Sequence, residues 1–459
     1  MQTDAYAAFL AGKAPRARAI GFEPGPMHPK MRADQVDVTA FAIRQGCAAL
    51  FLDTGMGKTF DELEWCRQCA HASNGFALLL TPLAVARQIE AEAHRWGYDA
   101  RVIRSQEDAR PGINICNYDR APLLEPAKFG AVALDESSAI TDFSSATTRM
   151  LTAAFADHRF KLCATATPAP NDYMELGTHA DFLGQMSNLE MLSRWFINDT
   201  STASQRWRLK GHAESSFWEW LASWSRCAET PADLGFTEVG FVLPPLNVIR
   251  HTVAGDTRPP PGMLFAGDVS ATNIYDVKRQ TASARALSVA DLVRAEPHEP
   301  WLIWCDTDAE ADAVVKVLPE AVEVRGSHSP ERKESALMGF ATGSVQWLLT
   351  KPSIAGMGMN YQHCARMAYV GRTFSYRQWY QSVRRCWRYG QMRPVDVHLM
   401  VAEGEAQIGR VIDRKAADHA KMKRAMALAM AGARQSAETR IKYDPKHLGR
   451  LPAWLTSSL

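Results

Sequence analysis

The segment Thr54-Gly-Met-Gly-Lys-Thr59 joins an apolar run at residues 48–52 to residues 60–71, which have the pattern of an amphipathic helix. A glycine-rich turn between a buried strand and a helix leaves several backbone N–H groups unpaired, and the helix dipole adds positive potential there. Such a turn binds phosphate, so Lys58 would reach the β- and γ-phosphates of a nucleotide and the Thr59 hydroxyl would hold Mg²⁺. The usual first glycine of this pattern is replaced by Leu52. The predicted nucleotide-binding loop consists of Thr54, Gly55, Met56, Gly57, Lys58 and Thr59.

Two adjacent acids, Asp135 and Glu136, follow a second apolar run at residues 131–134. Mg²⁺ on ATP needs an oxygen ligand from the protein, and Asp135 suits that role. Glu136 is then placed to orient or deprotonate the attacking water. Adjacent acids at a strand end are often only a solvated turn, but the apolar strand that leads into this pair favours the catalytic interpretation.

Residues 335–395 contain no Asp or Glu, yet they include Lys351 and seven arginines. A solvated helix surface normally mixes charges of both signs, so this composition indicates phosphate contact, from ATP, nucleic acid or both. Arg385 and Arg388 are three residues apart and would project from one face of a helix. They are therefore predicted to act as arginine fingers at an ATP site formed mainly by another domain.

These polar residues follow strands that alternate with helices. Residues 48–52, 76–80, 131–134 and 161–164 read as buried strands, with shorter candidates at 101–103 and 113–116. A second series begins at Trp301 and has strands at 345–350 and 367–370. Such alternation predicts an α/β fold with parallel sheets, which bind ligands at the carboxyl ends of their strands.

The composition is that of a globular protein with two or three domains. Apolar residues make up 46% of the 459 residues, charged residues 22%, and the net charge is +2. Nine scattered cysteines fit a reducing compartment, and Cys66 and Cys69 are better explained as structural than as half of a zinc site. No apolar run approaches about 20 residues, so we expect a cytoplasmic protein without a membrane span.

With these motifs in order, the chain resembles helicase superfamily 2 (DEAD/DEAH-box ATPases), in its Snf-type, chromatin-remodeller-like branch and in the compact form found in phages and prophages. The resemblance covers about residues 30 to 400. It implies ATP and Mg²⁺ as ligands, with catalytic roles for Lys58, Asp135, Glu136, Arg385 and Arg388 and metal binding by Thr59 and Asp135. It also implies nucleotide contacts by Gln35, which would recognise adenine, and by Gly358 and Gln381.

Further motifs of the family are associated with nucleic-acid contact or with coupling to the ATP site. They correspond here to Thr81 and Pro82, Asn117, Thr165 and Thr167, Thr350 and Asn360. Two residues depart from the family's motifs, and both departures concern the coupling of the ATP site to nucleic acid and not ATP hydrolysis. Ser138 replaces a common histidine after Glu136, and the family's following lysine is replaced around Thr141-Asp142.

The resemblance implies two RecA-like P-loop lobes, each a parallel sheet flanked by helices, with ATP between them. We expect an N-terminal ATP-binding lobe at residues 1–185 and a C-terminal helicase lobe at 297–402. A helical, Trp-rich insert and linker would occupy residues 186–296, and a basic helical tail residues 403–459.

The insert and the tail each have more than one interpretation. Five tryptophans mixed with basic residues between 194 and 224 could stack on nucleic-acid bases, but their helical spacing better fits a small core. Arginines near 206–210 stay candidates for a nucleic-acid contact. The tail could lie along DNA or brace both lobes, although an ordinary solvated helix is favoured.

The leading functional prediction is a duplex-DNA-stimulated ATPase that translocates without sequence specificity. The alternatives are a strand-separating helicase on DNA or RNA and a nucleotide-gated clamp with little hydrolysis, which the intact catalytic residues disfavour. A P-loop kinase or ring ATPase does not account for the motifs at 350–391. Replication or recombination proteins of a phage or its host are candidate partners.

Overall fold

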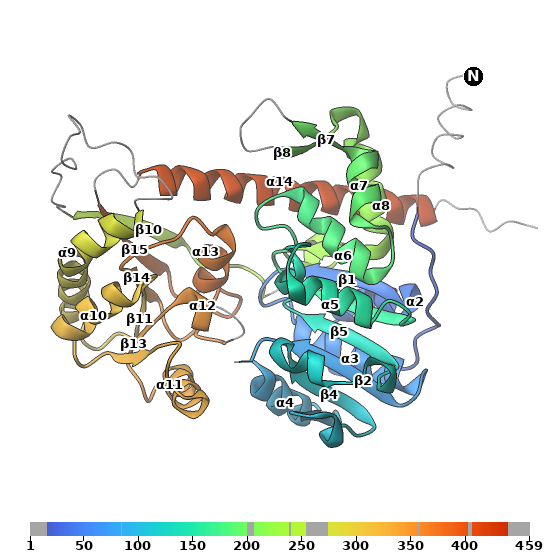
Figure 1. Cartoon of the computed structure of the whole chain (residues 1–459), viewed down its shortest axis with the longest axis horizontal. Helices are drawn as coiled ribbons and strands as arrows, with labels where there is room; N and C mark the ends of the chain where they lie inside the picture. Colours follow the sequence, from blue (N-terminus) through green and yellow to red (C-terminus); the bar gives the residue numbers. More distant parts are fainter. Residues whose placement is uncertain are drawn as a thin grey trace, which may run out of the picture.

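The computed structural model describes residues 16–83, 85–199, 206–237, 240–253, 274–355, 359–402 and 406–438. These residues form two α/β lobes, and one long helix, α14 (Ala406–Glu438), runs across both (Figure 1). None of the described helices is long and apolar enough to cross a membrane.

The first lobe is built on a sheet with the order β3-β4-β2-β5-β6-β1-β9, in which all neighbouring strands are parallel. Residues along β1 alternate between two apolar cores, one on each face, so this sheet is buried on both sides. Its strands are β1 (Cys47–Leu52), β2 (Phe76–Thr81), β3 (Ala100–Val102), β4 (Gly112–Asn117), β5 (Ala131–Asp135), β6 (Phe160–Ala164) and β9 (Ser225–Ala228). Its helices are α2 (Ala33–Gln45), α3 (Lys58–His71), α4 (Ala86–Arg95), α5 (Ala146–Ala154), α6 (Leu176–Leu183), α7 (Asn188–Trp195) and α8 (Glu214–Trp224).

The second lobe contains a parallel sheet with the order β10-β15-β14-β11-β13-β12. Its strands are β10 (Leu246–Val253), β11 (Trp301–Trp304), β12 (Val322–Val324), β13 (Trp347–Thr350), β14 (Arg366–Tyr369) and β15 (Val395–Ala402). Its helices are α9 (Ile274–Ala295), α10 (Asp308–Val317), α11 (Pro330–Thr342), α12 (Pro352–Ala355) and α13 (Tyr376–Val383). The two sheets confirm the predicted fold class of two parallel-sheet α/β lobes.

The predicted insert at residues 186–296 divides between the two lobes. Strand β9 pairs with β1 at the edge of the first sheet, and β10 pairs with β15 at the edge of the second. Helix α9 packs on the second lobe through Ala286, Val289 and Val293. In the structure the first lobe therefore extends past residue 185, and the second begins before residue 297.

The clustered tryptophans belong to the core of the first lobe. Trp195, Trp218, Trp220 and Trp224 are buried, and Trp195 stacks on Trp220 at 4.7 Å between ring centroids. These four side chains are accordingly not available to nucleic-acid bases, and the core interpretation of the sequence holds for them. A small antiparallel hairpin of β7 (Phe196–Asp199) and β8 (Arg206–Leu209) follows α7.

Helix α14 is a brace, not the solvated helix that the sequence favoured. Met422, Met426 and Met430 are buried in the core of the first lobe, whereas Ile408 and Ile412 are buried against Tyr376 of the second. Since one helix is anchored by apolar side chains at both ends, it ties the lobes together (Figure 1).

Candidate nucleotide site between the lobes

The phosphate loop follows β1 and ends where α3 begins at Lys58. Gly55 and Gly57 both have φ of +92°, a conformation that favours glycine. A Cβ on Gly57 would lie 2.4 Å from Gln35 Nε2, and one on Gly55 would lie 2.8 Å from Tyr389 Cδ2. The loop is therefore held closely on both sides, by α2 of its own lobe and by the second lobe.

Lys58 and Gln35 are oriented by the loop backbone. Lys58 Nζ donates hydrogen bonds to the carbonyl oxygens of Leu52 (2.9 Å) and Asp53 (3.3 Å). Gln35 Nε2 donates to the Gly57 carbonyl at 3.3 Å, and Arg32 Nη2 donates to the Met56 carbonyl at 2.7 Å. Gln35 thus lies beside the loop, as its predicted nucleotide contact requires, although its contact with adenine stays a prediction.

The two predicted catalytic acids lie at the carboxyl end of β5. Strands β2, β5, β6 and β1 are successive parallel neighbours, so their carboxyl ends share one edge of the sheet. Asp135 Oδ2 accepts a hydrogen bond from Thr81 Oγ1 at 2.7 Å. Burial and the neighbouring Glu136 carboxylate raise the pKa of Asp135 to about 6. A divalent cation would compensate this concentration of negative charge, so Asp135 with Thr59 on the facing helix fits Mg²⁺.

Glu136 is held in an unusual conformation between the lobes. Its φ is +51°, and it is the one non-glycine residue with a positive φ in the described chain. This left-handed backbone conformation costs about 1–2 kcal/mol. Its carboxylate accepts hydrogen bonds from Thr165 Oγ1 at 3.3 Å and from Gln381 Nε2 of the second lobe at 3.2 Å. The strained backbone therefore directs this acid toward the second lobe.

Arg385 and Arg388 differ in the hydrogen bonds that their guanidinium groups make within the protein. Arg385 is buried and donates to the carbonyl oxygens of Gln381 (3.0 Å) and Met359 (3.2 Å). Arg388 Nε has no hydrogen-bond partner among the described residues. Burial and the nearby Arg385 charge lower the pKa of Arg388 to about 10. A guanidinium with an unused donor beside a second one fits a bound anion such as phosphate.

Asp53, which sequence reasoning did not select, links the loop to the second lobe. It is fully buried, and its carboxylate accepts hydrogen bonds from Tyr380 Oη, from Arg384 Nη2 and from the backbone N–H of Thr54 at 2.7 Å. Although burial raises it, the Lys423 and Arg384 charges lower the pKa of Asp53 to about 2. An acid directly before a phosphate loop was the only signal in the sequence, because its side-chain partners Tyr380 and Arg384 are more than 300 residues away.

Helix α3 contains buried acids that an amphipathic pattern does not predict. Asp61, Glu62 and Glu64 are all fully buried, because α3 packs on the sheet and is flanked by α2 and α4. Both carboxylate oxygens of Glu62 lack hydrogen-bond partners in the described part of the chain. Burial and the Asp135 carboxylate raise the pKa of Glu62 well above its usual range. Cys66 and Cys69 are buried in the same helix.

The residues predicted to contact or couple to nucleic acid fall into two groups. Thr81, Thr165, Thr167 and Thr350 are buried; Thr350 Oγ1, for example, donates to the Val324 carbonyl at 3.1 Å. These four are positioned to support the ATP site or the lobe interior, not to touch a polymer directly. Pro82 and Asn117 are half-buried and Asn360 is exposed, so they stay candidates for contact, whereas Gly358 lies outside the described residues.

The arginine-rich stretch is not one continuous phosphate-binding surface. Arg366 pairs with Glu296 and Asp396, and Arg393 pairs with Glu299. Lys351 likewise pairs with Asp308 at 2.9 Å. The acids that balance the stretch come from flanking segments, so its charge pattern overstates the exposed positive surface.

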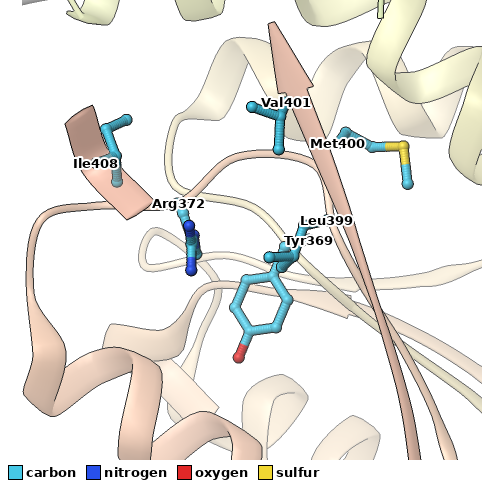
Figure 2. Close-up of a pocket in the computed structure, with 6 residues that line it drawn as sticks. All are labelled: Tyr369, Arg372, Leu399, Met400, Val401 and Ile408. Atoms are coloured by element: carbon cyan, nitrogen blue, oxygen red, sulfur yellow. The ribbon is translucent and has the colours of Figure 1, made fainter. Parts of the chain in front are cut away.

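A cavity of about 370 Å³ opens between the lobes beside this site, near the segments that follow Glu136 and Thr167. On its second-lobe side Arg377 donates to the Ser138 carbonyl at 2.8 Å. A smaller pocket lies where α14 begins on the second lobe (Figure 2). The smaller pocket is lined by Tyr369, Arg372, Leu399, Met400, Val401 and Ile408.

Residues 284–390 match the family described as helicase conserved C-terminal domain. This range holds four of the six strands of the second lobe and the arginines at 384–388, so the match lies in the second lobe and agrees with the predicted resemblance to helicases. No curated protein matches the chain. Among solved structures, the SWI2/SNF2 ATPase core of Sulfolobus solfataricus in complex with dsDNA is similar at 14% identity and a TM-score of 0.42, over 89% of this chain and 96% of that one.

Proposed function

We propose that this chain is an ATP-hydrolysing nucleic-acid motor of the Snf type, stimulated by duplex DNA. The observation that carries the proposal is the hydrogen bond between Gln381 and Glu136, which joins the predicted catalytic acid of one lobe to the helicase motif of the other. Arg385 lies one turn after Gln381 and donates to its carbonyl. A site shared in this way depends on lobe closure for its activity.

The residues present fit ATP with Mg²⁺. The phosphate-loop N–H groups and Lys58 would bind the phosphates, and Thr59 and Asp135 would hold the cation. Glu136 is the proposed base or orienting group for water, and Arg385 and Arg388 would stabilise charge that develops on the transferred phosphoryl group. Mg²⁺, when bound, supplies Lewis-acid polarisation of the phosphate oxygens.

The proposed polymer is DNA held through its phosphate backbone. Backbone contacts carry no sequence information directly, so the motor would bind without sequence preference. Raising salt from about 50 to about 200 mM should then weaken DNA binding by orders of magnitude. A flat salt response would contradict backbone binding.

The deciding experiment is steady-state ATPase activity without polymer and with single-stranded DNA, duplex DNA or RNA, using Lys58→Ala as the blank. Strongest stimulation by duplex DNA supports the translocase and leads to a triplex-displacement assay. Stimulation mainly by single strands or RNA would favour a strand-separating helicase instead. No turnover under any condition would contradict the motor and favour a nucleotide-gated clamp.

A further inference from the structure

Helix α14 passes over the junction of the lobes and presents one buried lysine there. Its first turns are anchored on the second lobe, where Ile408 lines one pocket together with Leu399 and Val401 of β15 (Figure 2). Its later turns are anchored in the first lobe through Met422 and Met426. Lys423 follows directly, with only 3% of its side chain exposed.

The Lys423 ammonium contacts groups from both lobes. It donates to Tyr380 Oη of the second lobe at 3.2 Å. In the first lobe it lies 3.2 Å from the Glu229 carboxylate and 3.9 Å from that of Asp53. A lysine is seldom buried unless its charge is paired, so these contacts account for its position.

Asp53 connects Lys423 to the phosphate loop. Its carboxylate accepts a hydrogen bond from the N–H of Thr54, the first residue of the loop, at 2.7 Å. Its carbonyl accepts one from Lys58 Nζ at 3.3 Å. The same carboxylate binds Arg384, the neighbour of Arg385 in sequence. Asp53 therefore contacts the first residue of the loop and the arginine segment through its carboxylate, and the phosphate lysine through its carbonyl oxygen.

We propose that Lys423 is a positioning residue of the nucleotide site, through which the C-terminal helix fixes Asp53 and with it the phosphate loop. The inference rests on the proposed function, since it assigns the helix a role in nucleotide binding. Loss of the ammonium would leave the Asp53 carboxylate with Arg384, Tyr380 and the N–H of Thr54. The loop would then adopt other conformations for part of the time. The apparent nucleotide affinity would fall in proportion to the fraction of molecules whose loop stays correctly placed.

The test compares Lys423→Met with Lys423→Arg and Lys421→Met in the full chain. Methionine keeps most of the apolar stem and removes the charge, while arginine keeps the charge. Lys421 is the matched control, because it lies on the same helix but is 63% exposed and pairs only at the surface with Glu214. The readouts are binding of fluorescent ADP with Mg²⁺, the KM for ATP, and the far-UV circular dichroism of each variant.

We expect Lys423→Met to weaken ADP binding and raise the KM about tenfold, Lys423→Arg to recover most of the loss, and Lys421→Met to bind like the unchanged protein. A folded Lys423→Met with unchanged affinity would overturn the inference. If that variant loses its helical signal, Lys423→Gln, which removes the charge and keeps a hydrogen-bond donor, tests the same link, and unchanged affinity there would overturn the inference as well. ADP binding without DNA-stimulated turnover would contradict the proposed motor while leaving this inference intact, whereas no ADP binding by the unchanged protein would overturn both.

Discussion

The carboxylate of Asp53 in the first lobe and the guanidinium of Arg384 in the second form a buried ion pair across the candidate nucleotide site. Both side chains are almost fully removed from water. Tyr380 donates a second hydrogen bond to the same carboxylate. The lobes are thus connected directly at the phosphate loop, and this connection involves the residue before the predicted arginine finger Arg385.

Replacing Asp53 with Asn should destabilise the protein by about 3 kcal/mol, because Arg384 would lose the carboxylate that it pairs with in the buried interface and Lys423 would keep only Glu229. The measurement is the calorimetric unfolding transition at neutral pH. Asp413→Asn is the matched control: Asp413 is 69% exposed and lies 3.7 Å from Arg250, so its loss should change stability by less than about 0.5 kcal/mol. Equal stability of the two variants would contradict a structural role for the Asp53 ion pair.

Lys58→Ala and Glu136→Gln should each reduce ATP turnover at least about a hundredfold for different reasons. Lys58→Ala removes a phosphate ligand and should also weaken nucleotide binding. Glu136→Gln keeps the size of the side chain, so binding should persist while hydrolysis is lost. Turnover assays paired with fluorescent ADP titration separate the two effects, and near-normal turnover in either variant would refute the active-site assignment.

Most residues of the candidate nucleotide site were selected from the sequence because they lie in local motifs. The phosphate loop and Asp135-Glu136 each follow an apolar strand, whereas Arg385 and Arg388 are three residues apart in a stretch without acids. The structure brings Gln381 to Glu136, as expected of a site shared by two lobes. Chemistry that depends on a few neighbouring residues is visible in sequence.

Contacts between distant segments could not be predicted in this way. Strand β9 reads Ser-Arg-Cys-Ala, which contains no apolar run, so its pairing with β1 had no local signal. The stripe of Met422, Met426 and Met430 has helical spacing, but spacing does not reveal which surface covers it. Lys423 likewise looked like one of several solvated lysines until the fold brought it to Asp53.

The two predicted arginine fingers should respond differently to substitution. Arg388 Nε has no partner among the described residues, so Arg388→Ala should abolish hydrolysis while nucleotide binding and thermal stability are largely kept. Arg385 holds two backbone carbonyls inside the second lobe, so Arg385→Ala should lose stability as well as activity. ATPase assays and calorimetry on both variants test this distinction. A large loss of stability in Arg388→Ala would instead make Arg388 a structural residue.

Acidification should weaken the attachment of α14 through His419. This histidine is buried between Tyr376 and Tyr380, and burial together with the Lys423 charge lowers its pKa to about 3, with Asp53 opposing and Arg384 adding to the effect. The pKa of this histidine is lower in the folded protein than in the unfolded chain, where it is near 6.5. Its contribution to stability is therefore complete above about pH 6.5 and is lost as the pH falls from there toward the folded pKa. Between pH 7 and pH 5 the loss from this group should be about 2 kcal/mol.

His419→Gln should therefore flatten the decline in stability between pH 7 and pH 5, measured by calorimetry at several pH values. The buried His179, whose pKa burial lowers to about 4, contributes a decline of its own that persists in this variant, so the difference between the two proteins isolates His419. His298→Gln, at an exposed position, should leave the slope unchanged. If the slopes of the unchanged protein and His419→Gln coincide, His419 is not held neutral between α14 and the second lobe. Helix α14 would then stay attached to both lobes in acid through its buried apolar side chains alone.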